Sequence, residues 1–235
     1  MTGLVTGFLP STSGFHFPNA FAKAPVMRIA VGPQEIPVGN AANGLCGGMA
    51  YAARDLFEAR VPPPPDRTPP SEGTPLFRYL VKRLFDSFDL PSGPVKYQLW
   101  QWLPRGDVWG LRGLSWRTIV QEGPLIRGDI DAGRLSPLGL VRTRSPSPLD
   151  LGRNHQVLAY GYELDEAAGL LTIRVYDPNH PDDDGVALRI RTTDPTRQVD
   201  IGYVAGEDPV YGFFRTRYTF ASPEGAVPEV IAAPP

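Results

Sequence analysis

The spacing of the apolar residues changes near residue 135, and this change limits the folds that the chain can adopt. Before that point, apolar residues recur every three or four positions, as on the buried face of an α-helix. After it, they alternate or cluster in short runs bounded by proline, glycine and aspartate, as in β-strands. Helices followed by strands are typical of an α+β domain. We therefore expect a helical N-terminal half and an antiparallel β-sheet C-terminal half, with a cleft between them.

The first half contains two strong helix signals. A broad apolar stripe from Leu45 to Leu56 predicts a central, mostly buried helix. Thr74 and Pro75 have the residue types of an N-cap and a first helical position, and apolar residues then follow at helical spacing to Phe88. Between these helices, seven prolines in residues 61–75 predict an extended connection. Shorter helices are expected at 94–103, 115–121 and 125–130, the last after a break at Gly123-Pro124.

The second half reads as a series of strands, at 138–141, 155–164, 170–176, 186–191, 200–204 and 210–220. An earlier strand is expected at 26–31, after an irregular stretch packed on the body of the protein. Together these segments predict one domain over residues 1–220, with a helical part at about 45–134 and a β part at 26–31 and 137–220. Residues 221–235 are expected to form a loosely ordered tail.

Charge and composition exclude several classes of protein. The formal net charge is −2, from 23 basic and 25 acidic residues, so no nucleic-acid or membrane partner is expected. No stretch approaches the roughly 18 apolar residues of a membrane span, and the first residues lack the pattern of a signal peptide. We expect a monomer that is cytoplasmic by default. The single cysteine can form neither an internal disulfide nor a zinc site of several thiolates.

That cysteine, Cys46, lies where a glycine-flanked loop enters the central helix. Unpaired backbone N–H groups and the helix dipole at this position stabilise a thiolate, which is the nucleophilic form of cysteine. Free cysteines are also often small buried apolar residues. Gly47 and Gly48 each cost about 0.8–1.0 kcal/mol relative to alanine in a helix. Either close approach of a substrate or tight helix packing would explain why both are present.

A cysteine nucleophile needs a base, and the geometry of one hairpin favours His155. The strand that begins at His155 and the strand that ends before Asp177 flank a short turn. If the hairpin is symmetric about Glu166, Val157 lies opposite Val175 and His155 lies opposite Asp177. Opposed residues share a face with Cβ atoms about 4.5–5.5 Å apart, so the carboxylate could orient the imidazole. Cys46, His155 and Asp177 would then act as nucleophile, base and orienting group.

These motifs resemble the papain-like cysteine peptidase fold, and most closely its bacterial double-glycine peptidase branch. The resemblance rests on Cys46-Gly47 at the start of a long helix, His155 at the start of a strand and Val-Tyr-Asp-Pro at the end of the next, in that order. It implies a peptidase or amidase that forms an acyl-thioester on Cys46, with no metal or cofactor and with a peptide, protein or amide as substrate. An active-site cleft between the two halves is also implied.

One position departs from that family's pattern. The family has a glutamine six residues before the nucleophile as an oxyanion donor, and this chain has Asn40 there, with Asn43 as a substitute. Removing one such donor typically costs about 10²–10³ in rate. Two alternatives therefore stay open: an acyltransferase that uses the same triad, and a catalytically silent papain-like binding or effector module.

The remaining titratable residues are expected to have structural roles. His16 lies among phenylalanines and is expected to be a packed or capping residue. His180 lies in an acidic turn at 177–185. The carboxylates of this turn could offer oxygen ligands to calcium, but the spacing of a calcium-binding loop is missing. We expect a solvated acidic turn.

Overall fold

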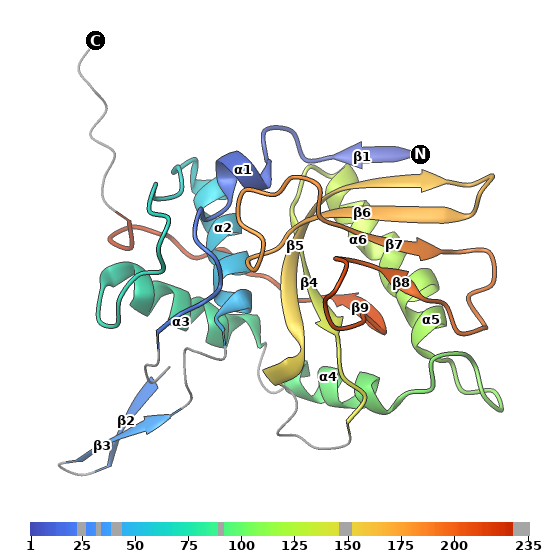
Figure 1. Cartoon of the computed structure of the whole chain (residues 1–235), viewed down its shortest axis with the longest axis horizontal. Helices are drawn as coiled ribbons and strands as arrows, with labels where there is room; N and C mark the ends of the chain where they lie inside the picture. The colour runs from blue at the N-terminus through green and yellow to red at the C-terminus, as the bar shows by residue number, and fades with distance from the viewer. Residues whose placement is uncertain (23–26, 32–33, 39–43, 89–91, 146–151, 228–235) are drawn as a thin grey trace.

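Figure 1 shows the computed structural model of the chain, which describes residues 1–22, 27–31, 34–38, 44–88, 92–145 and 152–227. The helical elements are α1 (Pro10–Ser13), α2 (Cys46–Ala59), α3 (Pro75–Ser87), α4 (Ser92–Trp102), α5 (Leu114–Trp116), the π-helix η2 (Arg117–Glu122) and α6 (Gly123–Asp131). The strands are β1 (Thr2–Leu4), β2 (Met27–Val31), β3 (Gln34–Val38), β4 (Ser136–Val141), β5 (His155–Asp165), β6 (Leu170–Tyr176), β7 (Ala187–Arg191), β8 (Ile201–Gly202) and β9 (Gly212–Arg215). None of the helices in these ranges is both long enough and apolar enough to cross a membrane.

The main sheet is antiparallel and curls around β5, as Figure 1 shows. Its strands follow the order β8-β7-β6-β5-β4-β9, and β1 also pairs with β5. β6 occupies one edge of β5, whereas the other edge pairs first with β4 and then with β1. The first eight residues of β5 are buried. The predicted α+β class is therefore observed, and His155 begins the central strand of the sheet.

Helix α2 lies in the core between β5 and α3. Its two glycines face close neighbours: a Cβ at Gly48 would lie 2.1 Å from the carbonyl oxygen of Leu80, and one at Gly47 would lie 2.3 Å from Ser87 Oγ. Heavy atoms cannot approach this closely without displacement. Tight helix packing, rather than substrate approach, therefore accounts for both glycines.

This packing predicts a large effect of one methyl group. Gly48→Ala is expected to lower the free energy of unfolding by about 1–3 kcal/mol, because α2 and α3 must separate to admit the Cβ. Urea unfolding followed by circular dichroism measures the change. The matched control is Gly128→Ala in α6, where a Cβ would meet no atom within 4 Å and should stabilise the helix by up to about 1 kcal/mol. Equal stability of the Gly48 variant and the parent would contradict the packing argument.

The helix predictions from the sequence hold best where capping and periodicity agree. α3 begins at Pro75, and the Thr74 hydroxyl accepts a hydrogen bond from the Phe77 N–H at 3.2 Å.

The predicted break at Gly123-Pro124 is wrong, because η2 and α6 form a continuous helical segment through it. A proline in the first turn of a helix needs no N–H donor there. The preceding π-helical turn therefore continues directly into α6.

Two predictions about strands also change. Among the described residues, the strand at 27–31 pairs with β3 in a separate two-stranded sheet and is not part of the main sheet. The segment predicted at 210–220 forms only the short strand β9, and the chain beyond it runs without regular structure. β1, which the sequence analysis did not predict, extends the main sheet beside β5.

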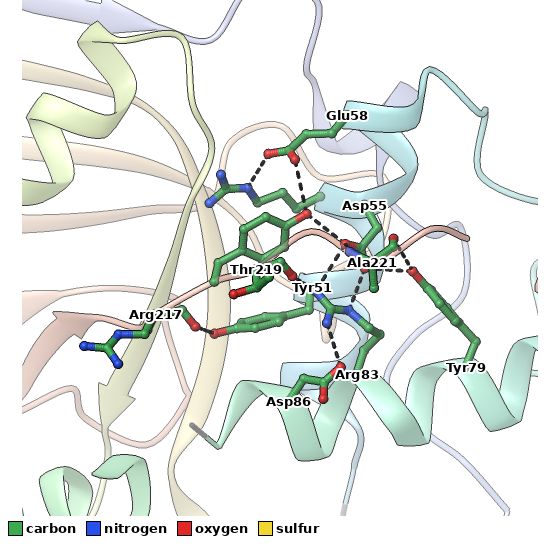
Figure 2. A network of polar contacts seen from close by, with 11 residues as sticks. Tyr51, Asp55, Glu58, Tyr79, Arg83, Asp86, Arg217, Thr219 and Ala221 are labelled. Atoms are coloured by element: carbon green, nitrogen blue, oxygen red, sulfur yellow. Dashed lines mark hydrogen bonds and ion pairs between the residues drawn. The ribbon is translucent and has the colours of Figure 1, made fainter. Parts of the chain in front are cut away.

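The segment after β9 is fastened to α2 and α3 through Asp55, and we call residues 217–221 the C-terminal latch. The side chain of Asp55 is fully buried. It accepts hydrogen bonds from Arg83 (2.6 and 3.1 Å), Tyr79 (2.9 Å), Tyr218 (2.8 Å) and the N–H of Ala221 (3.0 Å). Figure 2 shows these donors converging on the carboxylate from α3 and from the latch. One buried carboxylate thus joins three segments that are distant in the sequence.

The residues after the latch are also held, although the sequence predicted a loose tail from 221 onward. Ala226 is buried, and Val227 packs against the hydrophobic core. Residues 228–235 lie outside the described ranges.

Candidate active site

Cys46 lies at the first residue of α2, as predicted, and is partly exposed. The chain enters the helix through Gly44, whose φ of 92° is in the left-handed region that favours glycine. The N–H of Leu45 donates to the side-chain oxygen of Asn19 at 2.6 Å. No side chain caps α2, and none of the described residues accepts a hydrogen bond from the N–H of Cys46. A donor is therefore available beside the thiol.

His155 and Asp177 are in direct contact. The Nε2 of His155 lies 2.6 Å from Oδ1 of Asp177, and both side chains are almost completely buried. Because an ionised carboxylate can only accept, Nε2 carries the proton and donates. This leaves Nδ1 for other partners, and the charge of His155 and its side-chain hydrogen bonding lower the pKa of the Cys46 thiol.

The predicted register that led to this pair is wrong, although the two residues do meet. Ala159 lies opposite Val175, not Ile173, and Leu158 lies opposite Tyr176. The hairpin is therefore displaced by two residues from the predicted register in this region. A shift of two preserves the face on which each side chain lies, whereas a shift of one would reverse it. If this register is continued past Leu158 and Tyr176, His155 and Asp177 become diagonal neighbours, within reach of an imidazole ring.

The electrostatic setting favours a thiolate beside an imidazolium. Burial alone would raise the pKa of the Cys46 thiol, but His155 and the N–H of Gln156 outweigh burial and lower it. Burial likewise opposes the imidazolium, but the charges of Asp177 and Cys46, with their hydrogen bonds, raise the pKa of His155 to about 10. Each group therefore stabilises the charged form of the other.

Asp177 is held in its ionised form by three donors. Burial would raise its pKa, but His155, the Tyr203 hydroxyl and the N–H of Asn179 lower it to about 2. The Asn179 N–H lies 2.8 Å from Oδ1, and Tyr203 donates to Oδ2. Sequence reasoning missed Tyr203, because it follows a strand of only two residues and no spacing rule connects it with Asp177.

Asn19 is a second residue that sequence reasoning missed. Its side-chain oxygen accepts from the N–H of Leu45, and its Nδ2 donates to Oδ1 of Asn179 at 3.1 Å. Asn179 in turn donates its backbone N–H to Asp177. Asn19 and Asn179 therefore link the residue before Cys46 to Asp177 through hydrogen bonds. Asn19 fixes the entry to α2 relative to the segment after β6 that carries Asp177 and Asn179.

The two predicted oxyanion donors, Asn40 and Asn43, lie outside the described residues. The other candidate residues have separate roles. His16 Nδ1 contacts Asp182 at 2.5 Å, and His180 contacts Glu207. Both histidines thus bind carboxylates outside the triad.

The acidic turn does not gather its carboxylates around one point. Asp182 pairs with His16 and Arg67, and Asp184 accepts from Ser11. Asp183 accepts from the nearby Gly185 N–H. These partners hold the turn against the body of the protein.

Within the described ranges, Asp177, His180 and Glu207 are the group whose ligand atoms lie close enough together, within 4.8 Å, to hold a metal ion. Glu207 also pairs with Arg142 at 2.9 Å, and Asp177 is bound by His155 and Tyr203. A cation already compensates each carboxylate, so this arrangement is an ion-pair cluster.

The site thus contains a thiol whose pKa an imidazole lowers, a buried carboxylate bound to that imidazole, and a backbone N–H at a helix start that no described residue accepts. Searches against models of protein families, curated proteins and solved structures found no match to this chain.

Proposed function

We propose that the chain is a papain-like thiol hydrolase, a peptidase or amidase that acts through an acyl-thioester on Cys46. The observation that carries the proposal is the position of His155, whose Nε2 contacts Asp177 and whose charge and hydrogen bonding act on the thiol of Cys46. A buried ion pair contributes little to stability, because the cost of desolvating both charges offsets much of their attraction. A nucleophile that must be ionised before substrate arrives gives this arrangement a use.

The chemistry follows from these positions. The Cys46 thiolate attacks the carbonyl carbon of an amide, and the developing oxyanion accepts a hydrogen bond from the N–H of Cys46. The imidazolium of His155 gives its proton to the leaving nitrogen, the C–N bond breaks and an acyl-thioester remains. His155, now neutral, takes a proton from a water molecule that attacks the thioester. The acid is released, and the thiolate–imidazolium pair is restored. Asp177 holds the ring in one orientation throughout.

Iodoacetamide labelling is expected to locate the reactive thiol. Because the pKa of Cys46 is lowered, alkylation should persist below the pKa of about 8.5 of a free cysteine and should fall only when the thiolate is protonated. Mass spectrometry of timed reactions measures the rate at each pH. A labelling profile like that of free cysteine would overturn the proposal.

Hydrolysis should have a second, alkaline limit that labelling lacks. The proton of His155 is present below its folded pKa of about 10 and is lost above it, so leaving-group protonation fails there. A screen of fluorogenic peptide amides with the parent protein and Cys46→Ala measures this limit.

Product analysis with an added amine separates hydrolysis from acyl transfer, since the second reaction yields a new amide. A reactive thiol without turnover of any amide would favour a silent module.

A further inference from the structure

A cavity of about 520 Å³ lies between the helical part and the edge of the sheet formed by β4 and β9. One end is close to the triad. Its lining includes Ser87, whose Oγ lies close to Gly47, the residue after Cys46. The lining also includes Tyr97, whose hydroxyl donates to the carbonyl oxygen of His155 at 3.3 Å. The volume is in the range of pockets that bind small ligands or a few residues of a peptide. A group bound here would lie beside Ser87 and Tyr97, which border Gly47 and the backbone of His155.

The lining of this cavity is strongly cationic. Its charged members are Arg54, Lys96, Asp129, Arg134, Arg215 and Arg217. Two arginines, Arg134 and Arg215, share the single carboxylate of Asp129, at 3.0 and 3.1 Å. Lys96 pairs with Glu122, and Arg54 pairs with Glu58.

Arg217 has no carboxylate partner among the described residues, and its side chain is exposed. Figure 2 shows its guanidinium directed away from the contacts of the latch. The five cations of the lining pair with three carboxylates, Asp129, Glu122 and Glu58, so this group carries two positive charges in excess. The potential in the cavity attracts anions.

Aromatic rings hold two of these cations in place. The Arg54 guanidinium lies 3.7 Å from the centroid of the Tyr218 ring, and Lys96 Nζ lies 4.4 Å from that of Phe214. Both contacts are within the distance at which a ring attracts a cation. Charges that are positioned before the ligand arrives bind it with less loss of side-chain entropy.

We propose that this cavity binds a carboxylate-bearing segment of the substrate, which is an acidic peptide. Guanidinium groups accept carboxylates in a two-pronged geometry, and arginines provide four of the five cations. Assignment of the ligand as part of the substrate rests on the proposed hydrolase function. The binding of an acidic segment does not, since it depends on the charge of the cavity alone.

The test measures binding without turnover. Full-length protein carrying Cys46→Ala is titrated by calorimetry with an acetylated, amidated tetraglutamate peptide and with its tetraglutamine counterpart. The tetraglutamate is expected to bind at least about tenfold more tightly, and raising the salt from about 0.05 M to about 0.5 M should reduce this advantage. Equal affinity of the two peptides, or no binding of either, would overturn the proposal.

A matched pair of charge reversals locates the site. Arg217→Glu is expected to weaken tetraglutamate binding at least about tenfold. Arg191→Glu should change it by less than about twofold, because Arg191 is exposed on β7, which two strands separate from β4. Equal effects of the two reversals would overturn the assignment to this cavity. Thermal unfolding checks that both variants fold, and Arg134→Gln replaces Arg217→Glu if that variant does not.

The two proposals fail in different ways. If the acidic peptide binds but Cys46 of the parent protein labels like a free cysteine, the hydrolase function is overturned while the anion site stands. If Cys46 is reactive and the peptides bind alike, only the site is overturned.

Discussion

Replacing His155 with alanine is expected to lower the iodoacetamide labelling rate of Cys46 at about pH 6 by about 100-fold, and amide hydrolysis by about 10⁴-fold or more. The imidazole supplies both the positive charge and the side-chain hydrogen bond that lower the pKa of the thiol. Without them, burial raises that pKa and the thiol is protonated at neutral pH. Hydrolysis loses more than labelling, because the leaving nitrogen also loses its proton donor.

A second variant and a control separate this effect from general damage to the fold. Asp177→Asn keeps a side chain of the same shape but removes the charge that raises the pKa of His155, so hydrolysis should fall by about 10²–10⁴-fold. His16→Ala removes a histidine that contacts Asp182 instead, and it should label like the parent. If the His16 and His155 variants label at the same rate, the nucleophile–base relation is wrong.

The parts of this site that the sequence could predict depend on local patterns. The start of α2 follows from a glycine-flanked loop that leads into an apolar stripe, and β5 and β6 follow from apolar runs on each side of a turn. The register was not predictable: it differs from the predicted one by three residues near the turn and by two near Ala159. His155 and Asp177 share a face only because the irregularity between Ala159 and Gly161 changes a shift of three into a shift of two.

The parts that could not be predicted depend on the geometry of the whole chain. The register of the hairpin includes an irregularity between Ala159 and Gly161, and no residue pattern announces it. Tyr203 and Asn19 reach the site from segments that only the tertiary fold places there. The same holds for the cationic cavity, because its charges come from α2, α4, α6, the turn after α6, β9 and the chain after β9, while the overall net charge is close to zero.

Replacing Asp55 with alanine is expected to lower the free energy of unfolding by about 3–5 kcal/mol, the largest effect on stability that we predict. Asp55 is fully buried and compensates Arg83, whose side chain is also buried. Without this carboxylate, Tyr79, Tyr218 and the N–H of Ala221 lose their acceptor as well. Urea unfolding of the parent and the variant measures the difference.

Two controls bracket this value. Asp86 pairs with the same arginine but is exposed, so Asp86→Asn should cost less than about 1 kcal/mol. Tyr218→Phe removes one donor and should cost about 1–2 kcal/mol. A loss in Asp55→Ala no larger than that in Asp86→Asn would contradict a central role for the carboxylate.

Because the latch also carries Arg217, loss of Asp55 should weaken the binding of acidic peptides at temperatures where the rest of the fold persists. Stability and the proposed recognition of anions therefore depend on the same buried carboxylate.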